Sequence, residues 1–271
     1  MRLLPAILFR SGGNDVIVKP DIVNFIEGDF SAAENPRRTF EVTIPKAFNP
    51  ATDFILYDDF AQFSFVGGVS GYLFGKFNWS LNYFFSSANA TILQDAYGIV
   101  ATNPGTIRLV SGSSNTASIC IVPSTGANNS VGGNTPNLHY ISAIASPDAS
   151  TSNKRQLVGM VNTIDINDNP PLGIYFQATN TGNWLAITKN SSTTTTDTGI
   201  AQSTSFKRME FLLNASGTSI GFYIDGTLVA THTTNIPSTG ITPIFHIKNT
   251  ASGSKRLDVD YVYVRASLMS R

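Results

Sequence analysis

The sequence has little charge, and the charge that it has is balanced. Asp, Glu, Lys and Arg make up 13% of the 271 residues, and the 18 acidic residues equal the 18 basic ones in number. Typical soluble domains carry about 25% charged residues. The balance argues against a basic nucleic-acid-binding surface and against an acidic tail, so we expect no nucleic-acid partner. A polar but charge-poor surface favours packing against other proteins.

Cysteine and long apolar runs are also scarce. The single cysteine, Cys120, lies in the apolar run 118–122, which excludes a disulfide framework within the chain. We expect a buried structural thiol, since a free cysteine in such a run behaves as a small hydrophobic residue. No run approaches the ~18 apolar residues of a membrane span. Residues 3–9 are apolar but lack a cleavage pattern, which indicates a strand and not a signal peptide.

Signatures of metals and cofactors are missing as well. No pair among the three histidines has the spacing of metal ligands, and there is no glycine-rich phosphate loop. Residues 165–169 begin like a calcium loop, but Pro170 and Phe176 stand where an EF-hand has Gly and Glu. We favour an Asx-type turn there, with a different calcium loop as the alternative, and we expect no cofactor. The histidines, expected in core or surface roles, are His139, His232 and His246.

What the sequence does contain is alternation, most clearly over residues 206–265. Every second residue is apolar in 209–213 and again in 220–224, and a period of two predicts half-buried strands. Asp225-Gly226 follows directly. Asp-Gly between alternating runs is the strongest short hairpin signal, because both turn residues must accept positive φ.

The last run of this stretch, residues 259–264, is apolar on both faces toward its end, which predicts a central strand of a packed sandwich. No ten-residue helical pattern with a good cap occurs, so we expect few helices. The threonine-rich residues 190–199 are interpreted as a mobile loop tip or as an extended arm laid on a neighbour. Further strands are predicted at residues 3–9, 16–18, 39–44, 77–85, 106–110, 118–122, 138–145, 156–166, 173–178 and 184–188.

Several motifs carry a resemblance to a known fold. The Phe-Tyr-Ile-Asp-Gly hairpin at 222–226 and the Asp-Val-Asp-Tyr-Val-Tyr-Val run at 258–264 resemble the end of a concanavalin A-like jelly roll. Lectins, laminarinase-type glucanases and many phage virion proteins share that fold. The Leu-Tyr-Asp-Asp-Phe opening at 56–60, Trp79 and the Asn-Pro-Gly turn at 103–105 are similar to a jelly-roll module of phage structural proteins. The resemblance implies an all-β jelly-roll sandwich.

The resemblance spans residues 53–265, and the region before it differs in composition. Residues 1–52 hold three of the four glutamates and the Arg37-Arg38 pair. We predict an attachment and oligomerisation region at 1–52 and a jelly-roll domain at 53–271, because charge at an interface rim sets partner choice. The alternative is that residues 1–52 supply outer strands of the same sandwich.

Catalytic patterns are weak. The Gly-x-Ser-x-Gly at 217–221, with Asp225 and His232 after it, matches a nucleophile elbow, but an elbow needs the strand, turn and helix of an α/β fold. Glucanases of this fold carry Glu-x-Asp-x-x-Glu or a near variant as their acid and nucleophile. The only glutamate beyond residue 52 is Glu210, and no acidic residue lies within three positions of it.

Asp258 and Asp260 are the remaining candidates for an acid/base or metal pair, since residues two apart on a strand point to one face. We expect them instead to face solvent or to pair with Arg256 or Lys255.

We therefore interpret the chain as a non-enzymatic structural protein of a phage virion, either a capsid decoration, a head fibre or a tail component. Its partners would be other virion proteins and copies of itself, with a trimer as the leading arrangement. One alternative is a carbohydrate-binding module or receptor-binding protein, in which exposed Trp79, Trp184 or Tyr263 would stack on a host surface glycan, although aromatic residues in strands are mostly core. The other alternative is a degenerate polysaccharide hydrolase or lyase.

Overall fold

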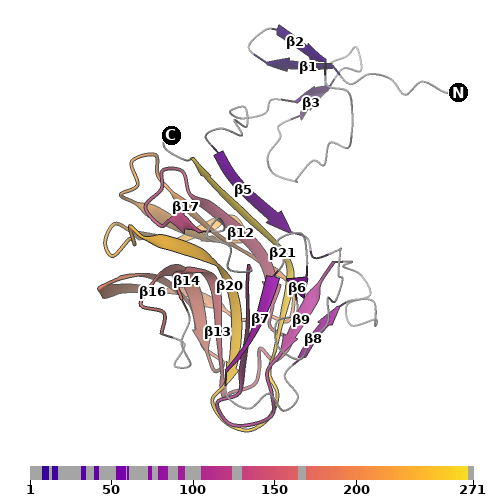
Figure 1. Cartoon of the computed structure of the whole chain (residues 1–271), viewed down its shortest axis with the longest axis vertical. Coiled ribbons are helices and arrows are strands. Elements are labelled where there is room, and N and C mark those ends of the chain that lie inside the picture. Colours follow the sequence, from indigo (N-terminus) through magenta and orange to yellow (C-terminus); the bar gives the residue numbers. More distant parts are fainter. Residues whose placement is uncertain are drawn as a thin grey trace, which may run out of the picture. The chain divides into compact units, whose positions relative to one another are not determined.

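The computed structural model describes residues 8–11, 14–17, 32–34, 40–42, 53–58, 60, 73–74, 79–84, 91–94, 105–123, 130–163 and 169–267. The chain divides into two compact units, residues 1–51 and 52–271. The first unit contains two short antiparallel pairs, and the attachment role of residues 1–52 stays a prediction. The pairs are β1 (Leu8–Ser11) with β2 (Asn14–Ile17), and β3 (Ala32–Glu34) with β4 (Phe40–Val42) (Figure 1).

The second unit consists of two antiparallel sheets. Its described residues form no helix, and so none that could cross a membrane. The first sheet has nine strands in the order β16-β15-β14-β13-β20-β10-β7-β6, with β11 paired to β20. These strands are β6 (Leu73–Phe74), β7 (Trp79–Phe84), β10 (Ser118–Pro123), β11 (Val131–Gly132), β13 (Lys154–Val161), β14 (Leu172–Thr179), β15 (Asn183–Asn190), β16 (Ser192–Ala201) and β20 (Gly240–Asn249).

The second sheet has eight strands in the order β19-β18-β17-β12-β21-β9-β8, with β5 paired to β21. The expected all-β class is therefore confirmed. The strands of this sheet are β5 (Asp53–Asp58), β8 (Thr91–Gln94), β9 (Ile107–Val110), β12 (His139–Ala145), β17 (Lys207–Leu213), β18 (Ile220–Ile224), β19 (Thr227–His232) and β21 (Arg256–Ser267).

The main core lies between the inner faces of the two sheets. The apolar positions of β17 point inward and are buried, as the period of two predicts. Phe222 of β18 joins the two layers through its ring. The centroid of this ring lies 6.0 Å from that of Phe211 in its own sheet and 5.3 Å from that of Phe176 in the other sheet, which it meets edge-on. Each such buried side chain contributes about 1.5–3 kcal/mol through removal of apolar surface from water.

The hairpin at Asp225-Gly226 is confirmed. Ile224 pairs with Thr227 across it, and the two turn residues have φ of 50° and 78°. The Asp225 carboxylate accepts a hydrogen bond of 2.9 Å from the backbone N–H of Arg208, which fixes the turn to the neighbouring strand β17. The central position of the last strand is also confirmed, since β21 pairs with β12 on one side and with β9 and β5 on the other.

Two local predictions are wrong. The threonine-rich segment 190–199 is not a mobile loop tip, because β16 runs from Ser192 to Ala201 as the edge strand of the nine-stranded sheet, while contact of this extended segment with a neighbour stays a prediction. Threonine is β-branched and favours strands, which outweighs the lack of apolar residues in the segment. The strand predicted at 156–166 ends at Val161, and the proposed calcium loop at 165–169 lies outside the described residues except for Asn169.

A second apolar layer lies on the outer face of the nine-stranded sheet. Cys120 belongs to it and is buried with a free thiol, as expected. Gly159 provides the close approach that this layer needs: its φ is +151°, and a Cβ there would lie 2.6 Å from the Tyr175 Cα. The buried members of the layer are Cys120, Leu157, Val161, Tyr175, Ile187 and Ile244.

Candidate functional site

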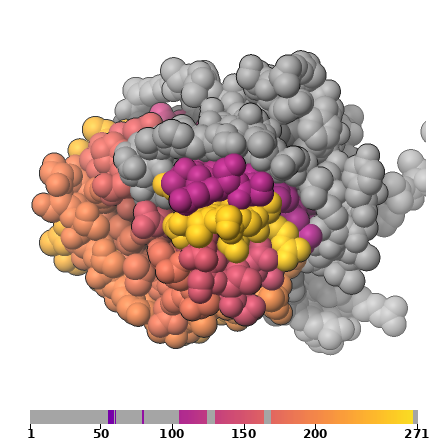
Figure 2. All heavy atoms as spheres, turned by 90° about the horizontal axis from the view of Figure 1, so that it is seen from below, coloured from indigo at the N-terminus to yellow at the C-terminus, as the bar shows by residue number. Residues whose placement is uncertain are grey.

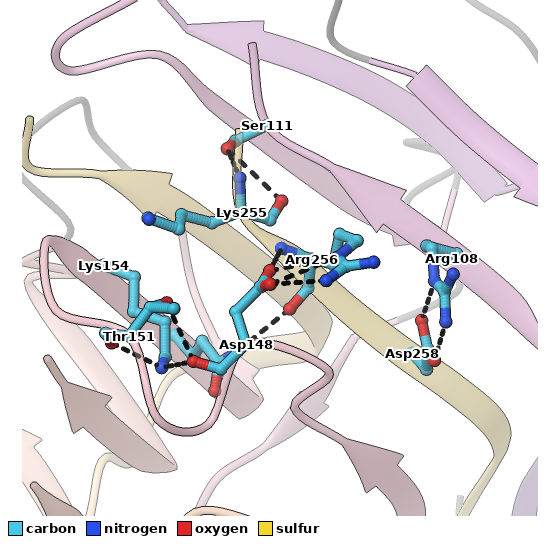
Figure 3. Close-up of polar contacts among 9 residues, drawn as sticks. Arg108, Ser111, Asp148, Thr151, Lys154, Lys255, Arg256 and Asp258 are labelled. Atoms are coloured by element: carbon cyan, nitrogen blue, oxygen red, sulfur yellow. Dashed lines mark hydrogen bonds and ion pairs between the residues drawn. The ribbon is translucent and has the colours of Figure 1, made fainter. Parts of the chain in front are cut away.

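Three connections meet at one end of the sandwich and form a polar cluster. They join β9 to β10, β12 to β13, and β20 to β21 (Figure 3). In the view from below, segment 105–123 lies against the C-terminal segment, coloured yellow (Figure 2). Ser111 ties these two together, since its N–H donates to the Lys255 carbonyl at 2.9 Å and its Oγ accepts from the Lys255 N–H at 2.9 Å.

Asp148 is the central carboxylate of this end cluster. It accepts hydrogen bonds from the Arg256 backbone N–H at 2.8 Å and from Arg256 Nη2 at 2.6 Å. Burial raises the pKa of Asp148, but the hydrogen bonds and charge of Arg256 together outweigh it and hold the pKa below its usual value. Asp148 therefore stays ionised at neutral pH and holds the β12–β13 connection to β21.

Lys154 closes the same connection from inside. Its ammonium donates to the Thr151 carbonyl at 3.0 Å and also to the Asp148 carbonyl, so the turn wraps around a buried cation. Burial lowers the pKa of Lys154 to about 8. A lysine with such a pKa can act as a base where substrate reaches it, but this one is fully buried and its donors serve the loop.

Asp258 is buried and not solvent-facing, and its hydrogen-bonded ion pair is with Arg108 and not with Arg256 or Lys255, so the predicted pairing is wrong here, although the charge of Arg256 also acts on Asp258. Arg108 forms a two-point ion pair with it, Nε to Oδ1 at 2.6 Å and Nη2 to Oδ2 at 2.7 Å. The reason is strand order: β9 lies beside β21 in a register that places Arg108 opposite Asp258. A register shift in the β12–β21 pairing skips Asp260, so spacing alone no longer places the two aspartates on one face.

A different kind of surface covers the outer face of the eight-stranded sheet, here called the tyrosine face. One row of cross-strand neighbours runs over six strands of the sheet. Ile55 (37% exposed), Leu212 (38%) and Leu228 (53%), the large hydrophobic residues most exposed in the described part of the chain, lie on this face. The row consists of Tyr57, Tyr263, Ile141, Glu210, Tyr223 and Leu228.

Glu210 supplies the fixed charge of the tyrosine face. Its two oxygens contact His139 Nε2 at 2.7 Å and Arg208 Nη2 at 3.0 Å. Burial raises the pKa of Glu210, but His139 and Arg208 lower it more, so the net pKa lies below its usual value. Tyr263 lies edge-on to the His139 ring at 5.9 Å. The face thus combines aromatic rings, exposed apolar groups and an ionised carboxylate, which suits binding better than proton donation.

The structure places the three predicted glycan contacts in two different environments. Trp79 lies in the main core, where its Nε1–H donates to Asp58 at 2.9 Å and its ring packs on Phe60 and Phe245. Trp184 is buried on the inner face of β15. Neither tryptophan is exposed, as the alternative of glycan stacking would require; both take the core position that we favour for aromatic residues in strands.

Tyr263 does lie on an outer face, although only 8% of it is exposed. Sequence reasoning missed its companions, Tyr57 and Tyr223. A signal for both existed: each has the opposite parity to a neighbouring core residue, Leu56 and Phe222 respectively. The strand order, which places the three tyrosines in one row, could not be predicted from the sequence.

The nucleophile-elbow pattern has no catalytic geometry. Asp225 is bound in the hairpin turn, and His232 lies inside the sandwich with 3.0 Å contacts to Thr188 and Thr196. Thr188 donates its proton to the Thr234 carbonyl, so it accepts from His232 Nδ1–H, and Nε2 accepts from Thr196. Burial lowers the pKa of His232, which favours this neutral tautomer.

The described residues also contain no group of three or more His, Cys, Asp or Glu residues that could hold a metal ion.

Comparisons with known proteins agree with this architecture. A family profile described as "SO2946-like, C-terminal domain" matches residues 102–262, while no curated protein matches in sequence. The structure is similar to the protein of unknown function SO2946 from Shewanella oneidensis MR-1, with 16% identity over 84% of this chain and 98% of that one and a TM-score of 0.51.

Enzyme structures share the fold as well. An endo-1,3-beta-glucanase from Streptomyces sioyaensis matches with a TM-score of 0.52 and 12% identity, over 83% of this chain and 100% of that one. A native glycosidic hydrolase matches with a TM-score of 0.50 and 14% identity, over 80% and 97%. The predicted jelly-roll β-sandwich of the concanavalin A-like, glucanase type is therefore confirmed at the level of the fold.

Proposed function

The chain belongs to the family of the SO2946-like C-terminal domain, and we propose that it is a non-enzymatic structural protein of a phage particle with a binding face on its jelly-roll body. One observation carries the proposal. The fold is that of glucanases, yet the carboxylates with described contacts are engaged by cations, backbone N–H groups or other donors. These carboxylates and their donors are Asp58 with Trp79, Asp148 with Arg256, Asp197 with Asn183, Glu210 with His139 and Arg208, Asp225 with Lys207, and Asp258 with Arg108.

Glycoside hydrolysis needs a different electrostatic arrangement. One carboxyl group must keep its proton near neutral pH, which requires a raised pKa, and a second must lie about 5–9.5 Å away as nucleophile or base. In the part of the chain that the structure describes, the pKa values of Asp148 and Glu210 are shifted, and both are shifted downward by their partners. Their charges stabilise connections and strands, which is the use expected in a binding or structural module.

The virion location is supported by a sequence resemblance and by composition. Residues 53–265 resemble a jelly-roll module of phage structural proteins, and only 13% of the residues are charged, which favours packing in an assembly. Residues 1–52, with their concentrated charge, would attach the body to other virion proteins and to further copies of the chain.

Two experiments test the proposal. Phage particles purified from the producing culture and treated with an antibody to this chain should carry immunogold label at fixed positions. Recovery of the protein only from the soluble lysate would contradict a virion role. Full-length protein incubated with laminarin, alginate and capsular polysaccharide should release neither reducing ends nor unsaturated ends, and sustained turnover on any of them would overturn the non-enzymatic assignment.

A second candidate function, glycan binding, is favoured by the tyrosine face. Rings at Tyr57, Tyr263 and Tyr223 lie in one row, and aromatic rings stack on sugar faces. Retention of the full chain on a glycan array should then fall for Tyr223→Ala and Tyr263→Ala. Ser252→Ala, at an exposed position of the β20–β21 connection, serves as the matched control and should bind like the unmodified chain.

A further inference from the structure

Among the strands that the structure describes, none pairs with the outer edge of β16, so β16 forms an open edge of the nine-stranded sheet. It pairs with β15 on one side only, and every second residue from Thr193 to Ala201 is exposed. Such an edge presents backbone N–H and C=O groups that can pair with another strand. Over residues 192–197 the pairing with β15 is regular, and the register shift comes only after Asp197, where Gly199 has a φ of +71°.

The edge of the other sheet on the same side of the sandwich is protected. In β19 a register shift opposite Phe222 and Tyr223 interrupts the ladder, which is a common way to block edge pairing. Residues 192–197 of β16 have neither a bulge nor the lysine or proline that usually protects an edge. This contrast between the two edges indicates that the backbone of β16 is kept available for pairing with another strand.

The inward side chains of β16 hold the strand rigidly in place. Thr194 bonds Thr234 at 2.7 Å, Thr196 bonds His232 at 3.0 Å, and Thr198 donates to the Trp184 carbonyl at 2.7 Å. A strand already fixed in its extended form loses little further conformational entropy when it pairs with another strand. The outward positions Thr193 and Thr195 remain exposed.

We propose that β16 pairs antiparallel with β16 of a second copy of this chain, about a twofold axis at Thr195, so that the two nine-stranded sheets become continuous. An antiparallel strand pair is self-complementary under a twofold axis. Thr193 then lies opposite Asp197 of the partner subunit, on the same face of the joined sheet.

Charge and shape favour a second copy as the occupant. Asp197 is the only charged residue of β16, and this register keeps the two Asp197 carboxylates several residues apart. Threonine pairs facing each other across strands are stabilising. The contact is separate from the oligomerisation predicted for residues 1–52, so it can hold or fail independently of the proposed function.

A charge-swap experiment on the full chain tests the register. At the twofold axis residue 195 meets its own copy, so Thr195→Lys and Thr195→Glu each place like charges opposite each other. In sedimentation velocity each variant alone should show its dimer dissociation constant raised at least ~tenfold, and an equimolar mixture should restore dimers. Thr231→Lys, an exposed position on β19, is the matched control and should dimerise normally with the same circular dichroism.

A second variant detects the β16 contact directly, even if residues 1–52 also hold copies of the chain together. Thr195→Cys should form a disulfide-linked dimer on mild oxidation, since residues directly opposite in an antiparallel pair have Cβ atoms about 4.5–5.5 Å apart and small adjustments close the bond. Cys120 is buried and should not compete. The proposal is overturned if Thr195→Cys does not cross-link, if Thr195→Lys assembles like the unmodified chain, or if the unmodified chain captures only unrelated extended peptides on this edge.

Discussion

The outer faces of the two sheets are built on different principles. On the eight-stranded sheet, charged groups form ion pairs, as in Arg108 with Asp258 across strands and Arg208 with Glu210 along β17. On the nine-stranded sheet the corresponding face carries a buried apolar layer, in which Leu157 and Ile244 are as deeply buried as the residues of the main core. The first face can stay in contact with water and with ligands, whereas the second is a packed layer. The strands of a sheet that is buried on both sides have continuous apolar sequences, and the second part of β13 shows that pattern.

The largest expected effect comes from breaking the ion pair on the eight-stranded sheet. Asp258→Ala would leave the Arg108 guanidinium without its buried partner, which should lower the free energy of unfolding by about 3–5 kcal/mol. Urea denaturation followed by circular dichroism measures this. Lys207→Ala, which removes a more exposed pair with Asp225 and leaves the hydrogen bond of Asp225 to the turn in place, is the control and should cost about 1 kcal/mol or less. Equal losses would show that the outer face is uniformly solvated.

The second prediction addresses the apolar outer layer. Leu157→Ala on the nine-stranded sheet should cost about 2–5 kcal/mol, as in a true core, because the cavity cannot be filled by water. Leu212→Ala on the tyrosine face should change stability by only about 0.5 kcal/mol, since Leu212 is 38% exposed. Melting of both variants by calorimetry compares them directly, and a small loss for Leu157→Ala would remove the distinction between the two faces.

The third prediction concerns His246, whose strand position places it on the outer face of the nine-stranded sheet. Burial, with help from Lys248 and Arg155, lowers its pKa from 6.5 to about 3. Below pH 6.5, His246 therefore binds a proton in the unfolded chain but stays neutral in the folded chain. Stability should therefore fall as the pH drops from 6.5, with a slope from this group of up to about 1.4 kcal/mol per pH unit.

Urea titrations at several pH values between 6.5 and 4.5 measure that slope. His246→Gln should flatten it, whatever its effect on stability at pH 7. An unchanged slope in this variant would assign the acid sensitivity to other groups, such as His232.

The smallest effect is expected at the hairpin of the eight-stranded sheet. Gly226 has φ of +78° and no atom near its missing Cβ, so only backbone strain opposes substitution. Gly226→Val should cost about 1–2 kcal/mol, and Gly226→Asn less, because asparagine tolerates positive φ. Thermal melts compare the two variants; similar losses for both would point to a cause other than the turn.

The accuracy of sequence reasoning follows the same division between the sheets. Alternation predicted β17 and β18, because these strands bury one face only, and the Asp-Gly turn predicted the hairpin into β19, but not the register shift within β19. In the nine-stranded sheet, runs buried on both faces do not tell which side a residue takes, so Trp184 could not be placed. The partners of Asp258 and Asp148 lie 150 and 108 residues away, and no local pattern encodes strand order over such separations.

The tyrosine face shows the same limit. Each of its tyrosines has a readable parity, but their alignment depends on the order β5-β21-β12-β17-β18, which only the fold provides. The prediction of a mobile loop tip where the edge strand β16 lies failed for another reason. Its threonines resemble low-complexity sequence, while their β-branched side chains and hydroxyl contacts to His232 and Thr234 make a well-fixed strand.

The burial of both tryptophans has an optical consequence. Trp79 and Trp184 are the only two in the chain, and both belong to strands of the nine-stranded sheet. Their fluorescence should be blue-shifted in the native protein and should report the opening of the core between the two sheets, as seen from the nine-stranded sheet. Tyrosine absorbance comes mainly from the other sheet, with Tyr57, Tyr140, Tyr223, Tyr261 and Tyr263. Recording both signals in one melt therefore shows, without any label, whether the two layers separate together or one before the other.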